Sequence, residues 1–354
     1  MTVSASSARR RTEADGAVYA ALQDAAAGRA LAEAPPPPPG PPVQQVSVDG
    51  AMVPLADGSW REVRTLAIGT VAAGRAPGAV RCTALSYFSR LAEAAAFTDL
   101  AAGEVHRRGV ETAGAVAGVV DGAPWCQAFL DAHRPDAVRI LDFPHAAQRL
   151  TTAAEAVWGS GPAAQAWAAA QRAELRDGDP AAVLAAVREL PAGEAGDPAA
   201  AGRVRAEVLG YLEPRLGQMR YAAFRARGLP IASGAVESAN KLVVEARLKG
   251  AGRRWAEASV NPMVGLRGAL CSGRWGEAWA AIAAARRPRA DRPQPAAAPA
   301  ASAASVAAPV RRPRHPAVPA VPPAGPPRAI AGRPTAAHPW KRSAGARPPS
   351  TAKL

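Results

Sequence analysis

The sequence predicts an α/β protein in which a mixed β-sheet is flanked by helices. The segments 43–48, 60–71 and 79–88 are rich in β-branched residues and follow one another closely, which is typical of an antiparallel meander. Two further apolar segments, 115–120 and 137–141, alternate with helical patterns and therefore indicate parallel strands. Beyond residue 141 every pattern is helical, so the sheet is expected to lie in the first half of the chain.

The predicted strands of the meander end in turn-forming residues. The first strand is expected to stop at Asp49-Gly50, a dipeptide that on its own is simply a good hairpin turn. A Gly/Pro turn at 74–78 separates the next two strands. A helix is expected over 89–108, where apolar residues recur at helical spacing.

The parallel part of the sheet is predicted from a buried run of residues. Segment 115–120 is almost continuously apolar, as a central strand requires, and it ends at Asp121-Gly122. A helix over 124–133 leads to the short strand 137–141. From 143 to 227, Ala/Leu/Arg helical patterns broken by Gly and Pro predict a helical insertion.

A later helix, predicted over 233–249, carries an acid and a basic strip. Glu237 lies in its first turn, and Gly250 ends it. Its core-facing side is expected to consist of Val236, Asn240, Val243, Val244 and Leu248. Charged helix faces are usually only solvated, and Glu237–Lys241 and Glu245–Lys249 are ordinary i,i+4 pairs, so this helix alone does not define a site. A final helix or helix pair is expected over 262–285.

The two ends of the chain differ from its middle. Residues 8–34 predict a short helix, and 35–42 a stiff proline-rich spacer. The tail, 286–354, holds 13 of the 43 Lys and Arg residues but only one acid, so it is expected to be disordered and attracted to polyanions. We therefore divide the chain into the parts 1–42 (helix and spacer), 43–142 (sheet), 143–227 (helical insertion), 228–285 (Glu237 helix and closing helices) and 286–354 (basic tail).

The cysteines and the N-terminal sequence indicate the cellular compartment. The three cysteines are widely spaced, so they predict neither a disulfide framework nor a zinc ribbon. The sequence has no apolar signal region and no uninterrupted apolar span of about 18 residues. We expect a cytoplasmic protein without a membrane partner.

Three acids are the candidates for metal chemistry. Asp49 and Asp121 follow predicted strands, whose carboxyl ends present ligands in α/β sheets, and Glu237 lies on the later helix. Carboxylates without a histidine cluster favour Mg²⁺ or Mn²⁺, and two such ions about 3.5–4 Å apart support in-line displacement at phosphorus. A carboxylate pair also serves glycoside hydrolysis, but the low aromatic content and the basic residues near Glu237 favour phosphate.

Five motifs, in this order, resemble the transposases of the Kra-type insertion sequences, which belong to the DDE group and are Mutator-like. They are VDGAMVPL (48–55), VDGAPW (120–125), ILDFPH (140–145), GAVESANK (234–241) and RLKGAGRRW (247–255). The likeness runs from about Arg9 to Trp279 and resumes weakly near 332–342. Each motif alone is weak, but the combination is specific.

The resemblance implies a ribonuclease-H-like catalytic domain with an all-helical insertion before the catalytic glutamate. Asp49, Asp121 and Glu237 would be the catalytic acids and the ligands of two Mg²⁺ or Mn²⁺ ions, which act in DNA cleavage and strand transfer. Asp142 and His145 match the Asp-x-x-His signature of Mutator-like transposases, although His145 could equally be structural. DNA-binding or accessory roles fall on Lys241, Arg247, Lys249, Arg253, Arg254 and Trp255.

The expected partners are transposon-end DNA, target DNA and further copies of the chain. Family members precede the first motif with a longer N-terminal region, so a truncated chain is one expectation. Two alternatives stay open: a catalytically silent DNA-binding remnant, and a structure-selective nuclease on the same fold. Trp125 and Trp255 could stack on a base or could belong to the core.

Overall fold

The centre of the fold is a five-stranded sheet with the order β3-β2-β1-β4-β5. In this computed structural model, which describes residues 4–76, 79–191 and 198–287, all of these ranges belong to one unit that spans Met1–Pro293. The strands are β1 (Val43–Pro54), β2 (Trp60–Ala73), β3 (Val80–Leu91), β4 (Ala115–Val120) and β5 (Val138–Leu141). Strands β1, β2 and β3 pair antiparallel, whereas β4 pairs parallel with both β1 and β5. The mixed sheet predicted from the sequence is confirmed.

The end of β1 differs from the prediction. Asp49-Gly50 is not a hairpin turn, because Asp49 pairs with Thr65 and Gly50 with Arg64 inside the β1–β2 ladder. The chain turns instead at Asp57-Gly58, where Gly58 has a φ of +90°. Beyond Gly50 the side chains keep the period of two that a half-buried strand requires, with Ala51 and Val53 buried and Met52 exposed.

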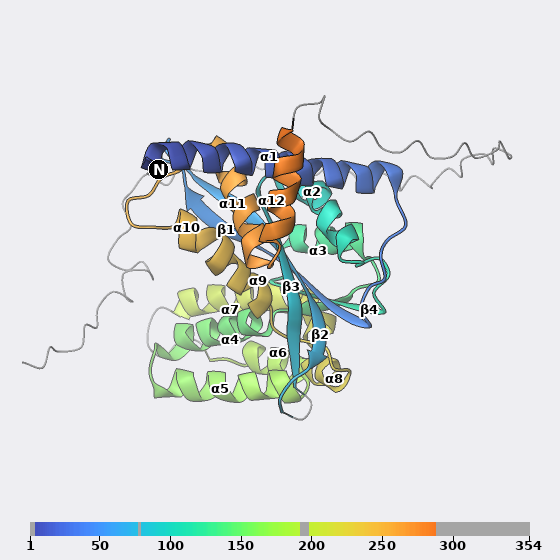
Figure 1. Cartoon of the computed structure of the whole chain (residues 1–354). Helices are drawn as coiled ribbons and strands as arrows, with labels where there is room; N and C mark the ends of the chain where they lie inside the picture. The colour runs from blue at the N-terminus through green and yellow to red at the C-terminus, as the bar shows by residue number, and fades with distance from the viewer. Residues whose placement is uncertain (1–3, 77–78, 192–197, 288–354) are drawn as a thin grey trace, which may run out of the picture. The chain divides into compact units, whose positions relative to one another are not determined.

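Helices and helical turns make up most of the remaining described chain (Figure 1). They are α1 (Ala5–Glu33), α2 (Ala94–Arg107), α3 (Pro124–His133), α4 (Phe143–Trp158), α5 (Pro162–Asp177), α6 (Pro180–Arg188), α7 (Pro198–Leu212), η1 (Glu213–Met219), α8 (Tyr221–Ala226), α9 (Gly234–Ala239), η2 (Asn240–Glu245), α10 (Ala246–Leu248), α11 (Glu257–Cys271) and α12 (Trp275–Arg286). None of the helices in the described ranges has the length and apolar character needed to cross a membrane. From residue 288 onward the predicted basic tail lies outside the described residues.

Each face of the sheet has its own hydrophobic core. On one face, Val46, Val48 and Leu66 pack with Phe97 of α2 and Phe129 of α3. On the other, alternating residues of β1 to β3 pack against α9, η2, α10 and α11, and residues of β4 and β5 pack against α4 and the helices that follow it. Asp49 has the same strand parity as Ala51 and Val53, so its side chain lies on the face covered by α9 and η2.

The stretch 143–227 is helical wherever the structure describes it. Helices α4, α5, α6 and α7 form a group at the lower left in the view of Figure 1, level with the lower parts of β2 and β3. Their apolar side chains, including Leu150, Leu175 and Leu212, form one core with Ile140 and Leu141 of β5. The helical group is therefore anchored on the parallel edge of the sheet, next to the ends of β4 and β5.

The helix predicted over 233–249 is interrupted by a π-helical segment. It consists of α9, the π-helical η2 and the single turn α10. Arg267 of α11 stabilises the wide turn, because its Nε donates to the carbonyl oxygens of Val243 (2.9 Å) and Leu242 (3.1 Å). A π-helical segment within an α-helix often marks a functional site.

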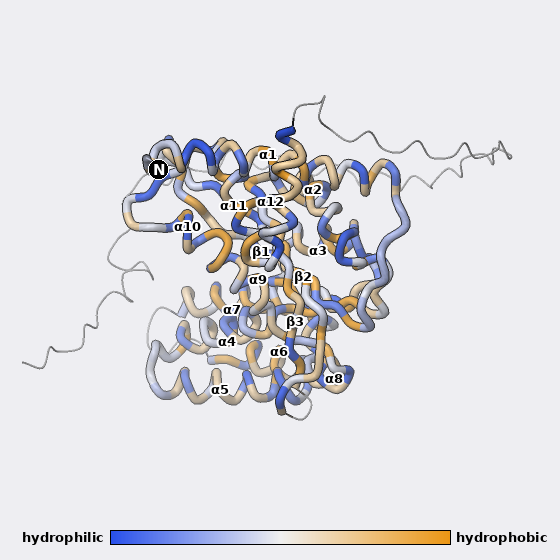
Figure 2. The backbone as a smooth tube through the Cα atoms, viewed as in Figure 1, coloured by the Kyte–Doolittle hydropathy of each residue, from blue (hydrophilic) through white to orange (hydrophobic). Residues whose placement is uncertain are grey.

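Helix α1 packs against α2, α11 and α12 although its residues are mostly polar or small (Figure 2). Gly16 permits the close approach to α11, because a Cβ there would lie 2.5 Å from the carbonyl oxygen of Pro262. The buried Arg90 of β3 supplies a polar anchor. Its Nη2 donates to the Ala20 carbonyl (3.2 Å), Gln23 Oε1 (3.1 Å) and Asp24 Oδ1 (3.0 Å).

Replacing Arg90 by leucine is expected to destabilise the protein by about 2 kcal/mol, because several charge-assisted hydrogen bonds to α1 are lost. The measurement is the free energy of unfolding from urea titration. Arg61→Leu on the neighbouring strand is the matched control, since its ion pairs with Glu93 and Glu257 are long and exposed; we expect less than about 0.5 kcal/mol there. Equal losses in the two variants would contradict the anchoring role of Arg90.

Candidate functional site

Three aspartates lie at the same level on three neighbouring strands. In the parallel ladders Val46 pairs with Gly118, and Val120 pairs with Leu141. If the two registers are continued by one to three residues along the strands, Asp49, Asp121 and Asp142 lie side by side. The backbone N–H of Asp142 donates to the Val120 carbonyl at 2.8 Å, so the β4–β5 ladder extends to this level.

Asp49 and Asp121 are both half-buried and are held by hydrogen bonds. Asp49 Oδ1 accepts the Gly50 N–H (2.7 Å), and its Oδ2 accepts Asn240 Nδ2 (2.8 Å). Asp121 Oδ1 accepts the Ala123 N–H (2.9 Å) and the thiol of the buried Cys126 (3.5 Å). As predicted, the strand ends at Asp121-Gly122, where Gly122 turns the chain with a φ of +83°.

The charges of these two carboxylates interact. Burial raises the pKa of Asp49, the Gly50 N–H opposes this shift, and the negative charge of Asp121 raises the pKa further. Like charges held together in a partly dry site favour the binding of a cation, which would offset both effects. Mg²⁺ is commonly held by one or two carboxylates while it keeps several waters. The pair therefore fits such an ion.

Asp142 has a different role from the two other aspartates. Its side chain is fully buried and caps α4, with Oδ2 accepting from the backbone N–H (3.1 Å) and Nδ1 (2.6 Å) of His145. Its Oδ1 accepts the N–H of Ser233 at 2.6 Å. Asp142 thus ties the end of β5 to the residue that precedes α9. Because it is buried and makes three hydrogen bonds within the protein, we interpret it as a structural acid of the site.

His145 lies between this structural acid and the paired acids. The hydrogen bond to Asp142 is the largest cause that raises the pKa of His145, burial opposes it, and the charges of Asp121 and Asp49 raise it further. The side chain is 47% exposed, so it can also meet a substrate. The bond to Asp142 and the exposed ring are consistent with either of the roles considered for His145.

The raised pKa of His145 makes a pH-dependent contribution to stability. The contribution is fully present below the unfolded-state pKa of about 6.5 and is lost as the pH rises through the higher folded-state pKa. We therefore expect His145→Gln to reduce the free energy of unfolding more at pH 5.5 than at pH 8.5. Urea titrations at both pH values measure this difference. A loss that grows with pH would contradict the assigned direction.

Glu237 lies on α9 but is not grouped with two other acids. It is half-buried in the first turn, and within the described ranges its carboxylate takes part in no hydrogen bond or ion pair. No group of three or more His, Cys, Asp or Glu side chains in the described part is placed to hold a metal. Glu237 nevertheless lies one turn before Asn240, whose amide contacts Asp49. The structure thus brings two of the three predicted acids together and places the third on the helix whose Asn240 contacts Asp49.

The predicted basic residues divide into exposed and paired ones. Lys241, Arg247, Arg253 and Arg254 are exposed. Lys249 forms the i,i+4 pair with Glu245 at 2.7 Å, as the solvated-helix interpretation expects. Four cations on the helix that bears Glu237, or just after it, are therefore accessible for contacts with phosphate.

Both candidate tryptophans have packing roles. Trp255 is half-buried, packs with the core beneath α9 to α11, and is bound to β1 by the hydrogen bond from its backbone N–H to the Pro54 carbonyl (3.2 Å). The guanidinium of Arg247 lies over its ring at 5.5 Å. Trp125 contacts Phe97 edge-on at 6.0 Å on the opposite face of the sheet. The geometry thus favours the core interpretation for Trp125 most strongly.

Sequence reasoning missed several residues that shape the site. Asn240 was assigned only to the apolar face of its helix, yet it contacts Asp49. From the helical insertion, the hydroxyl of Tyr211 donates to the Asp121 carbonyl, and Arg215 Nη2 donates to the Gly122 carbonyl at 2.7 Å. The sequence offered a signal for Asn240, because a polar residue on an otherwise apolar helix face is unusual. It offered no comparable signal for Tyr211 or Arg215.

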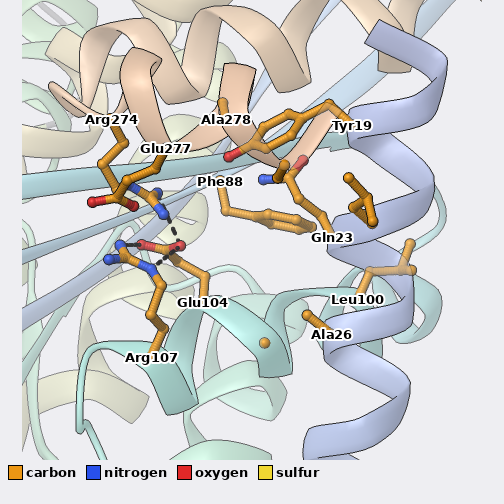
Figure 3. A pocket seen from close by; sticks show the side chains of 13 residues that line it. Tyr19, Gln23, Ala26, Phe88, Leu100, Glu104, Arg107, Arg274, Glu277 and Ala278 are labelled. Carbon is orange, nitrogen blue, oxygen red and sulfur yellow. Dashed lines mark hydrogen bonds and ion pairs between the residues drawn. The ribbon is translucent and has the colours of Figure 1, made fainter. Parts of the chain in front are cut away.

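Two hollows lie outside the row formed by Asp49, Asp121 and Asp142. A groove of about 670 Å³ borders α9 and includes Gln45, which precedes Asp49 by four residues on the same face of β1, and Ser238, the neighbour of Glu237. A second hollow of about 210 Å³ lies between α1, α2 and α12 (Figure 3). There Glu104 is held by Arg107 (2.6 Å) and Arg274 (3.0 Å). Asp49, Asp121 and Glu237 line neither of these two hollows.

Comparison with known proteins adds no relative. No protein-family model matches the chain, and no curated protein matches it.

Proposed function

We propose that this protein is a DDE-type DNA transposase that cleaves and joins DNA strands with the help of divalent cations. The observation that carries the proposal is the placement of Asp49 and Asp121 at one level of neighbouring parallel strands, crossed on the same face by the helix that bears Glu237. Acids on rigid strands suit phosphoryl transfer, because catalysis there depends on positioning and electrostatic stabilisation.

The sheet supports assignment to the ribonuclease-H-like folds. Three antiparallel strands are followed by two parallel strands, and the order is β3-β2-β1-β4-β5. The first acid lies on the central strand β1, the second directly after β4, and the glutamate on a helix that follows a helical insertion. This is the arrangement that the sequence resemblance implies.

The proposed cofactor is Mg²⁺ or Mn²⁺. Asp49 and Asp121 would hold an ion, and Glu237 would complete the acidic set once a substrate and a second ion are present. When bound, the ions would activate an attacking oxygen and stabilise the leaving oxygen. The protein itself supplies the fixed carboxylates, His145, whose ring bonds Asp142, and the exposed Lys241, Arg253 and Arg254 for the phosphate backbone.

The test is incubation of the full chain with Mg²⁺ and a duplex that carries the ends of its own element, with nicked and joined products scored separately. A transposase gives both products. Nicking of branched or hybrid substrates without joining would favour the structure-selective nuclease instead. Binding without any metal-dependent product would identify a DNA-binding remnant. Sedimentation of the protein–DNA complex in the same mixtures tests for the expected assembly of several copies.

The basic tail is proposed to add affinity without sequence selectivity. Its 13 cations would neutralise phosphates and release counterions. Removal of residues 286–354 is expected to flatten the salt dependence of DNA binding and to spare cleavage at low salt. Affinity measured between about 50 and 200 mM salt provides the slope. An unchanged slope would show that the tail does not touch DNA.

A further inference from the structure

Asn240 is the most unusual polar residue near the acids. Its side chain is 5% exposed, and its Nδ2 donates to Asp49 Oδ2 at 2.8 Å. Because an ionised carboxylate only accepts hydrogen bonds, the atom that contacts Asp49 must be the amide nitrogen, so the amide oxygen is the atom that remains free to accept. That oxygen, Oδ1, is buried and has no hydrogen-bond partner in the described part of the chain.

A buried polar atom without a hydrogen-bond partner is unfavourable. Leaving a buried carbonyl without a donor costs about 1–3 kcal/mol, and native proteins rarely keep such a group without a function. The neighbouring positions on the same helix face, Val236, Val243 and Val244, are all buried and apolar. An aliphatic residue at 240 would therefore pack there without the cost. Asn240 is also the first residue of the π-helical segment η2, the irregular part of the helix.

The surroundings indicate what the oxygen would bind. Asn240 contacts the carboxylate of Asp49, and the β1–β4 register places Asp121 at the same level on the neighbouring strand. The group that satisfies two carboxylates and one amide oxygen together is a hard cation, since Mg²⁺ and Mn²⁺ take both types of oxygen ligand. In the described part the acids alone provide no group of three, so an amide oxygen would supply a missing protein ligand.

We propose that Asn240 contributes its Oδ1 to the coordination of the divalent cation held by Asp49 and Asp121. The inference rests on the proposed function and extends it to a residue outside the three acids. Asn240 would thus act twice: its amide nitrogen orients Asp49, and its amide oxygen binds the ion. The π-helical segment would set the position of that oxygen relative to the strands.

The experiment measures Mn²⁺ binding to the full chain without DNA, by titration calorimetry and by the paramagnetic resonance signal of free Mn²⁺. Asn240→Ala is expected to weaken Mn²⁺ binding by about tenfold or more. Asn240→Asp is expected to bind Mn²⁺ at least as tightly as the wild type, because it offers an anionic oxygen at the same place. Asn261→Ala is the control, since Asn261 bonds the backbone of Leu91 from α11, and it should leave Mn²⁺ affinity unchanged.

The two Asn240 variants separate ligation from support of Asp49. If Asn240 only donated to Asp49, both variants would weaken binding, and the proposal would be overturned. Unchanged affinity in both, with binding lost in Asp49→Asn, would also overturn it while leaving the proposed function intact. A wild type that neither binds Mn²⁺ nor cleaves DNA would remove both proposals. Circular dichroism shows whether each variant folds. If Asn240→Ala does not fold, Asn240→Ser takes its place. We expect Asn240→Ser to weaken Mn²⁺ binding as Asn240→Ala does.

Discussion

Replacing Asp49 by asparagine is expected to reduce Mg²⁺-dependent DNA cleavage by about 10³-fold or more, as losses at residues that act as a unit usually do. The amide is nearly isosteric and can still accept the Gly50 N–H, so packing is kept while the ligand charge is lost. Asp121→Asn and Glu237→Gln should give comparable losses. The measurement is the single-turnover cleavage rate of end-bearing duplex at saturating Mg²⁺.

Non-additivity distinguishes a shared site from three separate effects. A double variant of Asp49 and Asp121 should be barely slower than either single variant. DNA affinity and the unfolding midpoint should stay close to those of the wild type. Asp57→Asn, in the exposed turn between β1 and β2, is the matched control and should cleave normally. Substantial cleavage in any one of the acid variants would remove that residue from the catalytic set.

Replacing Asp142 by alanine is expected to destabilise the protein by about 3 kcal/mol. The estimate combines the loss of a helix cap, about 1 kcal/mol, with the cost of leaving a buried N–H without an acceptor, about 1–3 kcal/mol. The orphaned group is the Ser233 N–H, which Asp142 Oδ1 holds at 2.6 Å. Since Ser233 leads directly into α9, cleavage should fall as well, because Glu237 and Asn240 lose their fixed position. Urea titration gives the free energy of unfolding.

The matched control for Asp142 is an exposed aspartate of the same region. Asp131 is 68% exposed and pairs with Arg139 at 2.7 Å, so Asp131→Ala should cost less than about 1 kcal/mol. Asp142→Asn should lie between the two, because it keeps one acceptor oxygen. A loss for Asp142→Ala no larger than that of the control would show that the three hydrogen bonds of Asp142 do not tie β5 to α9.

The sheet could be predicted from the sequence because its strands carry strong local signals. Segment 115–120 is almost purely apolar and lies between turn residues, and both its bounds and those of helix 124–133 agree with the structure. The end of β1 could not be located in the same way. Asp49-Gly50 and Asp57-Gly58 are equally good turn signals, and only the pairing of Gly50 with Arg64 decides between them.

The site was predictable in part for a related reason. Parallel pairing was enough to bring Asp49 and Asp121 together, because register is a property of the backbone, although Asp49 lies inside β1 and not at its predicted end. The role of Asn240 depends on the π-helical segment and on Arg267, which lies on another helix and bonds the carbonyls of Leu242 and Val243. Contacts of this kind join residues far apart in sequence and have no local pattern.

The most direct test of the metal-dependent mechanism is a change of metal preference in Asp49→Cys and Asp121→Cys. A thiolate is a poor ligand for Mg²⁺ but an acceptable one for softer ions such as Mn²⁺. If these side chains bind the catalytic ion, both variants should be inactive in Mg²⁺ and should regain measurable strand cleavage in Mn²⁺, while the wild type cleaves in either ion. Undiminished cleavage by the cysteine variants in Mg²⁺ would contradict the account.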